Sequence, residues 1–488
     1  MVFAKFRKSD LSRLAFIIGA REITYEQFSK HVAHIRSIFE VELSNVPVVG
    51  LSIRLGTYQH WVAHFAAASL GIATVALRPD QSTYKDVPVV GPVDPMQDAR
   101  LIALTPEIMK GAQEEKTKGA ALKNLTTFLE KNPDLLHRIV LTSGSTGSAR
   151  DVMLSNDMLS KRVERQNEWF ASFSSNKPSE RKSLNLMGRD TEGGFSGPMG
   201  RLLMRETCVF VGGGNGAAAI ENAVETSNLI GGSPAFFAGL VATGKKYPDH
   251  ETREIISVGA RLEGALVEKI RDALASKIIN GYGSTEVGIV ASHEQTGQMD
   301  DPSYVGQLYP GTQVEICSAA DEALPFGEEG KIRVKTPVMV DSYGKAHSEG
   351  AFKDGWFYPG DIGRLTKDGG LYVVGRDDDL LSVNGDKLLA SELESKLIES
   401  SYFDDACALV VNTKDHQQFL LVMTVTELKR KAQRKEIKKH IPFVPFRVVP
   451  VKQIPRNHMG KIERRALTEY AQGLVDRRAA ESSVADSE

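Results

Sequence analysis

A hydroxyl-rich loop with two glycines is the stretch of this sequence most suited to chemistry. The segment Leu141–Arg150 reads LTSGSTGSAR and follows an apolar run typical of a strand. Glycines let a backbone approach a ligand closely, and hydroxyls with exposed N–H groups suit phosphate oxygens. The loop therefore predicts a cradle for the phosphates of ATP or a similar nucleotide, formed by Thr142, Ser143, Gly144, Ser145, Thr146 and Gly147.

The composition of this loop is also compatible with a flexible surface turn of small residues. The loop does not fit the template G-x-x-x-x-G-K-[ST], because no Lys-Ser or Lys-Thr follows at the required spacing, so it is not a Walker A loop. The elements around the loop help to decide between a turn and a phosphate site.

Strand and helix patterns alternate before and after the loop. Apolar runs predict strands at residues 46–53, 72–77, 138–144 and 206–214, and helical spacing predicts helices at 23–39, 57–71 and 215–228. Alternating strands and helices imply parallel βαβ units. We therefore expect an α/β fold with doubly wound sheets reaching to about residue 300.

The pattern changes in the last third of the chain. Short alternating strands with Gly, Pro and Asp turns predict a small β-subdomain at about residues 303–377, which completes an N-terminal domain of residues 1–377. A hairpin-like segment, a helix from about Ala390, two strands and a basic helix then predict a small α+β domain at 378–475. The polar tail 476–488 is expected to be disordered.

Composition favours small-molecule chemistry in a reducing compartment. The 488-residue chain has a formal net charge of −2 with both signs interspersed, which gives no footprint for nucleic acid or an anionic membrane. Its three separated cysteines form no disulfide framework or metal motif. We find no signal peptide or membrane-spanning segment and expect a cytoplasmic protein. The basic segment 427–440 is most simply a solvated helix face.

Five segments occur in the order and at the spacing of one known family. They are TSGSTGSARDV (142–152), NGYGSTEVG (280–288), WFYPGDIGRL (356–365), GRDDDLLSVNGDKLLASELE (375–394) and PRNHMGKIERRAL (455–467). Together they resemble the motifs of the AMP-forming adenylating enzymes, the superfamily of acyl-CoA synthetases, nonribosomal-peptide adenylation domains and firefly luciferase. The resemblance covers nearly the whole chain and implies a small C-terminal domain that is mobile.

This resemblance implies roles for individual residues. Lys461 matches the lysine that bridges the carboxylate and ATP oxygens, Glu286 the Mg²⁺-binding glutamate and Thr285 an α-phosphate contact, so these are the expected catalytic residues. Asp378 matches the hinge of the mobile domain. Other nucleotide contacts implied by the resemblance are Gly259, Ala260, Arg261, Tyr282, Gly283, Asp361 and Arg376. The alternatives to these roles are a solvated lysine at 461, a tyrosine that only fills the core at 282 and a turn aspartate at 378. A calcium-binding loop around Asp378 is rejected, because the acidic run lacks the alternating ligands and the closing glutamate of an EF-hand.

The implied reaction is ATP-dependent activation of a carboxylic acid and transfer of the acyl group to coenzyme A. The Phe-Asp-x-Ser context that holds an amino-acid substrate in relatives is absent, so an aryl or short acyl acid is expected. A carrier-protein phosphopantetheine or an amine is the alternative acceptor. The basic segment 427–440 lies where relatives that use coenzyme A can place cations near its phosphates, which is the alternative to a solvated helix face. The residues expected to line the acid pocket are Gly193, Gly194, Phe195, Ser233, Phe236 and Gly281.

The phosphate loop departs from the family pattern at its end. Ala149, Arg150 and Asp151 stand where the family usually has Pro, Lys and Gly. Arg150 keeps the positive charge, but its planar guanidinium differs in geometry from an ammonium group. These changes leave open a non-catalytic, nucleotide-binding relative.

Overall fold

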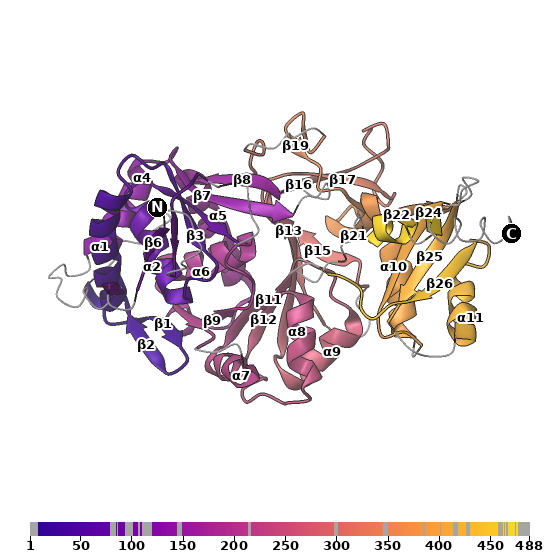
Figure 1. Ribbon diagram of the computed structural model, residues 1–488, viewed down its shortest axis with the longest axis horizontal. Coiled ribbons are helices and arrows are strands. Elements are labelled where there is room, and N and C mark those ends of the chain that lie inside the picture. Colours follow the sequence, from indigo (N-terminus) through magenta and orange to yellow (C-terminus); the bar gives the residue numbers. More distant parts are fainter. Residues whose placement is uncertain are drawn as a thin grey trace, which may run out of the picture. The chain divides into compact units, whose positions relative to one another are not determined.

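The chain packs into two compact units in a computed structural model (Figure 1). One unit comprises Met1–Gln313 with Val334–Phe357, and the other comprises Val314–Arg333 with Tyr358–Glu488. The domain boundary expected at 377/378 concerns movement, so it stays a prediction. The structure describes residues 8–78, 84, 86–92, 101–105, 108–109, 120–143, 149–212, 216–296, 301–344, 350–383, 386–400, 402–412, 418–425, 430–456, 462, 464, 467–473 and 475–476.

The first unit contains the parallel strands expected from the sequence, with helices between them. Its strands are β1 Leu14–Ile18, β2 Arg21–Thr24, β3 Val48–Ser52, β4 Ala73–Leu77, β5 Val89–Gly91, β6 Leu101–Ala103, β7 Leu136–Ser143, β8 Ala149–Ser155, β9 Lys182–Asn185, β10 Thr207–Phe210, β11 Leu229–Gly232, β12 Glu254–Val258, β13 Lys277–Ser284, β14 Gly288–Glu294, β15 Tyr304–Leu308, β18 Phe352–Lys353 and β19 Trp356–Phe357. Its helices are α1 Tyr25–Glu42, α2 Thr57–Ala68, α4 Ala120–Lys131, α5 Asn156–Phe173, α6 Glu192–Leu203, α7 Ala217–Thr226, α8 Pro234–Ala242 and α9 Gly264–Ala273.

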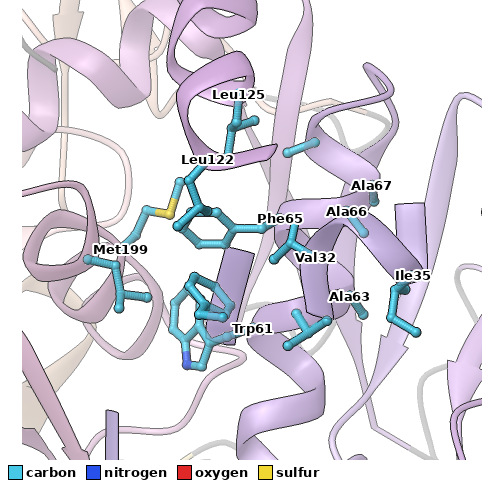
Figure 2. Packing of buried hydrophobic residues seen from close by; sticks show 14 of the residues in the cluster. Val32, Ile35, Trp61, Ala63, Phe65, Ala66, Ala67, Leu122, Leu125 and Met199 are labelled. Atoms are coloured by element: carbon cyan, nitrogen blue, oxygen red, sulfur yellow. The ribbon is translucent and has the colours of Figure 1, made fainter. Parts of the chain in front are cut away.

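A six-stranded sheet forms the N-terminal half of this unit. Its strand order is β6-β5-β3-β4-β7-β8, and all neighbours are parallel except β7 and β8, which form an antiparallel pair around the phosphate loop. Helix α2 packs on β3 and β4 of this sheet, and α1 packs against α2. Figure 2 shows Trp61 and Phe65 of α2 packed with side chains of α1, α4 and α6. Burial of these apolar side chains holds the helices against one face of the sheet.

A second sheet holds the strands on which the expected site residues depend. Strands β1, β10, β9, β11, β12 and β13 are parallel neighbours, while β2 and β14 pair antiparallel at the two ends of that run. Val224, Phe237 and Val267, from α7, α8 and α9, pack in one core cluster, and Trp169 of α5 packs in another against β11–β13. Apolar cover on both faces is the doubly wound α/β arrangement that the sequence predicted.

The start of the first helix differs from the expectation. The sequence pattern predicts a helix from Ile23, but Arg21–Thr24 is strand β2 and α1 begins at Tyr25. Thr24 accepts a hydrogen bond from the Gln27 backbone, while the Gln27 side chain accepts one from the Thr24 backbone. This capping box gives hydrogen-bond partners to the backbone N–H groups of Thr24 and Gln27. It therefore sets the first residue of the helix at Tyr25.

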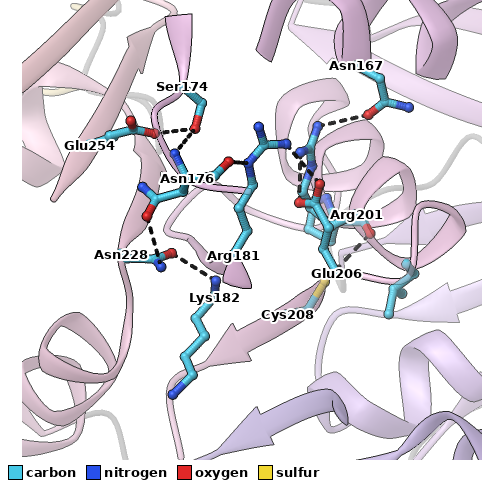
Figure 3. Close-up of polar contacts among 12 residues, drawn as sticks. Asn167, Ser174, Asn176, Arg181, Lys182, Arg201, Glu206, Cys208, Asn228 and Glu254 are labelled. Atoms are coloured by element: carbon cyan, nitrogen blue, oxygen red, sulfur yellow. Dashed lines mark hydrogen bonds and ion pairs between the residues drawn. The ribbon is translucent and has the colours of Figure 1, made fainter. Parts of the chain in front are cut away.

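A buried ion cluster joins β9, β10 and α6. The Glu206 carboxylate accepts hydrogen bonds from Arg181 at 3.0 Å and from Arg201 at 2.8 Å, and all three side chains are almost fully buried (Figure 3). Buried charges need such pairing, because removal of one partner would leave an uncompensated charge. This cluster is structural.

A second buried polar cluster lies under the six-stranded sheet. The Nε2 atoms of His64 and His137 are 3.1 Å apart, which requires one ring to donate and the other to accept. The other ring nitrogens contact Thr74 Oγ1 at 2.8 Å and Asn156 Oδ1 at 2.9 Å. Burial lowers the pKa of His137 to about 4 and that of His64 well below its usual value. Both histidines are therefore neutral in the folded protein at pH 7.

The second unit is built from short strands and helices. Its elements are β16 Gln313–Cys317, β17 Gly330–Lys335, β20 Asp361–Leu365, β21 Gly370–Arg376, β22 Leu380–Val383, β23 Asp386–Leu389, α10 Ala390–Glu399, β24 Ala406–Asn412, β25 Gln418–Thr424, α11 Arg430–His440 and β26 Phe446–Pro450. β22 and β23 form the expected hairpin, and β24-β25-β26 form a three-stranded sheet. The α+β expectation is confirmed, and strand β26, parallel to β25, adds to the two strands that the sequence predicts there.

Candidate functional site

The carboxyl ends of three parallel strands bring one group of the expected site residues to one edge of the second sheet. Gly232 of β11 is opposite Ser257 of β12, and Val258 of β12 is opposite Gly281 of β13. Ser233 follows the end of β11, Gly259–Arg261 follow the end of β12, and Tyr282 lies near the end of β13. In open α/β sheets, ligands bind outside the carboxyl ends of the strands. The structure therefore places these expected residues where a nucleotide site belongs.

Two glycines at this edge meet steric demands. Gly259 has φ +91°, a conformation that residues with a side chain rarely adopt. A Cβ at Gly283 would lie 2.2 Å from the Gly288 carbonyl oxygen, so the turn after β13 can close only with glycine there. Beside these glycines, Tyr282 is half-buried, while Ala260 and Arg261 are exposed.

Glu286 sits in the turn between β13 and β14 and is held from several sides. Its side chain is buried, with only 7% of the residue exposed. Its carboxylate accepts a hydrogen bond from the Tyr343 hydroxyl at 2.8 Å. Its backbone carbonyl accepts from Arg162 at 3.3 Å and from the Val340 N–H at 2.9 Å. These contacts fix the direction of the carboxylate, while neighbouring Thr285 is half-buried.

Tyr343 connects Glu286 to the end of the phosphate loop. Arg150 on β8 donates a hydrogen bond to the Tyr343 hydroxyl at 3.4 Å, and its guanidinium lies 5.1 Å from the centre of the Tyr343 ring. Burial, together with the charge of Glu286, raises the pKa of the Tyr343 phenol. The phenol therefore stays protonated and donates a hydrogen bond to the carboxylate. A cation, a phenol and a carboxylate thus form one linked series.

The phosphate loop itself is only partly described. Thr142 and Ser143 end β7, and Thr142 donates a hydrogen bond to the Arg150 carbonyl at 3.3 Å. Gly144, Ser145, Thr146 and Gly147 lie outside the described residues. The hairpin of β7 and β8 brings both ends of the loop together, with Thr142 opposite Arg150. The strand before the loop is confirmed, and the phosphate contacts stay a prediction.

The residues expected to line an acid pocket differ in their surroundings. Gly193 and Gly194 begin α6, and a Cβ at Gly194 would lie only 1.8 Å from the Gly188 carbonyl oxygen. Phe195 has no exposed surface and stacks on Trp61 with ring centres 5.9 Å apart.

The remaining expected pocket residues lie near the strand ends. Ser233 is buried just before α8, Phe236 is 38% exposed on α8, and Gly281 lies on β13. Packing alone accounts for Gly194 and Phe195, so Phe236 is the aromatic side chain of this set that a ligand can reach.

The expected ribose contacts lie in the second unit. Asp361 on β20 and Arg376 on β21 are opposite each other, and their side chains form an ion pair of 3.3 Å. Gly360, with φ +76°, precedes the aspartate, and its carbonyl accepts a hydrogen bond from the Asp377 backbone at 2.8 Å. A buried carboxylate beside a guanidinium suits hydroxyl groups of a ribose, a role that stays a prediction.

The expected hinge lies in an acidic run that ion pairs neutralise on either side. Asp378 lies in the short helical turn Asp377–Asp379. Asp377 pairs with Lys331 at 3.2 Å, and Asp379 pairs with Arg464 at 2.7 Å. These pairs give the acidic residues a structural role and argue against a calcium loop.

Arg464 ties the terminal motif to the rest of the second unit. Arg464 donates hydrogen bonds to both oxygens of Glu394, at 2.7 and 3.0 Å, and to the Ala408 carbonyl at 2.9 Å. Lys461, the expected catalytic residue in the same motif, lies outside the described residues. Its role stays a prediction.

Comparison with known proteins agrees with this geometry and decides the family. The sequence model described as AMP-binding enzyme matches residues 92–343, just over half of the chain. The chain belongs to the AMP-binding enzyme family. Within the described residues of this AMP-binding enzyme, no helix is long and apolar enough to cross a membrane.

Curated relatives share about half of the chain. The 4-coumarate–CoA ligase-like 4 of Oryza sativa subsp. japonica is 28% identical over 49% of this chain and 45% of its own length. The long-chain-fatty-acid–CoA ligase of Bacillus subtilis (strain 168) is 25% identical over the same shares, 49% and 45%. The match thus spans less than half of the length of these relatives.

Solved structures show the fold along almost the whole chain. The ATP-bound crystal structure of MatB from Rhodopseudomonas palustris has a TM-score of 0.81 at 20% identity and covers 97% of this chain and 98% of that chain. O-succinylbenzoate coenzyme A synthetase (MenE) from Bacillus subtilis, in complex with AMP, has a TM-score of 0.76 at 18% identity and covers 94% and 96%. Both likenesses establish the fold of this AMP-binding enzyme.

Sequence patterns did not reveal three residues that shape the site. Tyr343, Arg162 and Arg464 carry the contacts described above, yet only Arg464 stands inside one of the five motifs. Tyr343 is 57 residues from Glu286 in the sequence, so no local pattern links the two. The signal that could have found Arg464 is its position three residues after Lys461 in GKIERR.

Proposed function

We propose that this protein activates a carboxylic acid with ATP and transfers the acyl group to the thiol of coenzyme A. The observation that carries the proposal is the series Arg150–Tyr343–Glu286, which links the end of the phosphate loop to a buried carboxylate beside the strand ends. A non-catalytic relative would not need a carboxylate held in this way. The names of the CoA ligase relatives support the same reaction.

The proposed chemistry has two steps. A substrate carboxylate oxygen attacks the α-phosphorus of ATP, and the bond from that phosphorus to the oxygen bridging to the β-phosphate breaks, releasing pyrophosphate. The thiolate of coenzyme A then attacks the acyl carbon, and AMP leaves with the electrons of the carbon–oxygen bond. The first step brings two anions together, so positive charge at the phosphates lowers its barrier. Arg150 and Lys461 are proposed to supply that charge, with Thr285 at the α-phosphate.

The donor set fits magnesium bound together with substrate phosphates. Among the described residues, no three His, Cys, Asp or Glu side chains group closely enough to hold a metal alone. Mg²⁺ usually binds to one or two carboxylates plus phosphate oxygens and water, so Glu286 alone is a sufficient protein ligand. When bound there, the ion would neutralise phosphate charge. Tyr343 and Arg162 would keep the Glu286 carboxylate in place.

The acid and the acceptor are proposed from the sequence. An aryl or short acyl acid, with Gly193, Ser233, Phe236 and Gly281 near it, is supported by the small residues beside the strand ends. Coenzyme A is the proposed acceptor, and the three cysteines, all free and buried, agree with a reducing cytoplasmic environment. Swinging about Asp378 is proposed to separate the two steps.

Product analysis with purified protein tests the proposal. The protein is incubated with ATP, Mg²⁺ and a pooled panel of aryl, acyl and amino acids, with and without coenzyme A, and mass spectrometry detects acyl-AMP and acyl-CoA. We expect both products. An adenylate without a thioester would assign a carrier protein or an amine as acceptor, and no product with any acid would overturn the proposal.

A matched pair of lysine variants tests the role of Lys461. Lys461→Ala is expected to lower adenylate formation by at least about a hundredfold, because charge stabilisation in the transition state is lost. Lys452→Ala, an exposed lysine of the same segment, is the control and should keep the wild-type rate. Equal rates for the two variants would remove Lys461 from the mechanism.

A further inference from the structure

Helix α11 presents a cationic face to solvent. The face consists of exposed side chains at positions i, i+3, i+4 and i+7, which lie together on one side of a helix: Lys431, Arg434, Lys435 and Lys438. The opposite face packs on the second unit beside β26 through Gln433 and Ile437, both buried (Figure 1). The orientation of the helix is therefore fixed with its cations outward.

No acidic side chain of α11 pairs with the cations of this face. Glu436 is the single acid of α11, and it is buried and bonded by Lys439 at 2.5 Å and by His440 at 3.5 Å. Lys435 and Lys438 form no ion pair with any described carboxylate. Like charges at i, i+3 and i+4 repel each other, so this face gains stability from an external anion.

An aromatic side chain stands in solvent next to these cations. Phe443 is 91% exposed, in the turn that directly follows α11. The turn is held at both ends, because the Ile441 N–H bonds to the Ile437 carbonyl at 3.1 Å and the Leu420 N–H bonds to the Pro445 carbonyl at 2.8 Å. Pro442 and Pro445 restrict its backbone further. Phe443 is thus presented by a constrained turn and gains nothing from the packing of its own unit.

Tyr402 is a second partly exposed aromatic residue whose backbone contacts α11. It is 38% exposed, and its carbonyl accepts a hydrogen bond from Gln433 of α11 at 3.2 Å. Cations with an exposed aromatic residue beside them are typical of elements that lie at a membrane interface. The net charge of −2 hides this local concentration of positive charge.

We propose that Lys431, Arg434, Lys435, Lys438 and Phe443, here called the α11 surface, bind reversibly to an anionic lipid bilayer. The cations would contact lipid headgroup phosphates and carboxylates, and Phe443 would enter the boundary between headgroups and acyl chains. The cations suit a polyanion, and the exposed Phe443 ring, which gains free energy by leaving water, favours one with an apolar interior such as a bilayer. This inference is independent of the proposed catalytic function.

Vesicle co-sedimentation tests the inference. The full-length protein, without ATP or acid, is mixed with vesicles of equal parts phosphatidylcholine and phosphatidylserine, and with vesicles of phosphatidylcholine alone. We expect binding to the first, falling steeply with added salt, and none to the second. K435Q/K438Q should lower the partition coefficient about 25-fold, at about fivefold per cation near an anionic surface. Phe443→Ser should lower it about tenfold and keep the salt dependence.

The control variant has the same change in net charge elsewhere. K246Q/K367Q neutralises two exposed lysines outside α11 and should bind vesicles as the wild type does. Circular dichroism confirms that each variant is folded. Absence of binding to the anionic vesicles, or an equal loss in K246Q/K367Q, would overturn the inference. Binding of the wild type to an acidic carrier protein or to DNA, without binding to vesicles, would overturn it in favour of a macromolecular partner.

Discussion

Two buried polar clusters in the first unit use ionisable side chains in opposite ways. Around His64 and His137, burial lowers the pKa values, the rings are neutral, and their nitrogens contact each other, Thr74 and Asn156. Around Glu286, a carboxylate lies beside a phenol that has kept its proton, and Arg150 follows. The hydrogen bonds of the first cluster connect only buried core residues, while the second cluster lies beside the strand ends where a ligand can bind.

The difference shows that a shifted pKa does not by itself mark a functional site. Burial lowers the pKa of His137 to about 4, yet this histidine contacts only core residues. Glu286 is distinguished by its position after β13 and by its link to the phosphate loop. We therefore expect changes in the Glu286 cluster to affect catalysis and changes in the histidine cluster to affect stability.

The largest expected effect is on catalysis at Glu286. Glu286→Gln removes the charge but keeps the size of the side chain, so adenylate formation should fall by roughly 10²-fold or more. Pyrophosphate release measures this rate, and urea unfolding should change little. Glu294→Gln, an exposed acid at the end of β14, is the control. A Glu286 variant that unfolds at a much lower urea concentration but keeps its rate would reverse the comparison.

The next effect is on stability in acid. His137 binds a proton in the unfolded chain below about pH 6.5 but in the folded chain only at about pH 4, so the stability that its neutral form contributes is full above pH 6.5 and is lost as the pH falls. For His137 alone the loss is about 3 kcal/mol over this range. Urea unfolding of the wild type and of His137→Gln at several pH values measures it. Equal slopes against pH in the two proteins would contradict this account.

Tyr343→Phe should have a smaller effect on catalysis. It removes one hydrogen bond to a charged group, so the rate of adenylation should fall about tenfold. The concentration of Mg²⁺ needed for half of the maximal rate should change as well, because the phenol positions the Glu286 carboxylate. Tyr470→Phe, at a tyrosine that is 55% exposed, serves as the control. An unchanged Mg²⁺ dependence would mean that Tyr343 only packs.

The smallest expected effect is at Arg150. Arg150→Lys restores the family's residue type and keeps the charge. The compact ammonium group lacks the planar shape with which the guanidinium lies over the Tyr343 ring. The rate should change by about threefold or less, with a small change in thermal stability. Steady-state kinetics for pyrophosphate release measures it. A fall as large as that in Glu286→Gln would show that Arg150 has a role of its own.

Local sequence patterns predicted what depends on neighbours in the chain. Strands β3, β4, β7 and β10 coincide with the apolar runs that predict strands at residues 46–53, 72–77, 138–144 and 206–214. Contacts between distant segments could not be predicted in this way, since Tyr343 reaches Glu286 only through tertiary packing. The same holds for Phe195, whose neighbours Gly193 and Gly194 suggest a pocket but whose ring packs on Trp61.

The packing of Phe195 limits how this protein could acquire a new substrate. Its ring contacts Trp61 and lies 4.6 Å from the Arg138 guanidinium, so replacing it with alanine would cost roughly 3–5 kcal/mol of stability. Phe236 has no such ties and is partly open to solvent. Selection for a different acid would therefore act first on Phe236, because its replacement leaves the scaffold intact. Phe195 would change only in a protein stable enough to tolerate the loss of its packing.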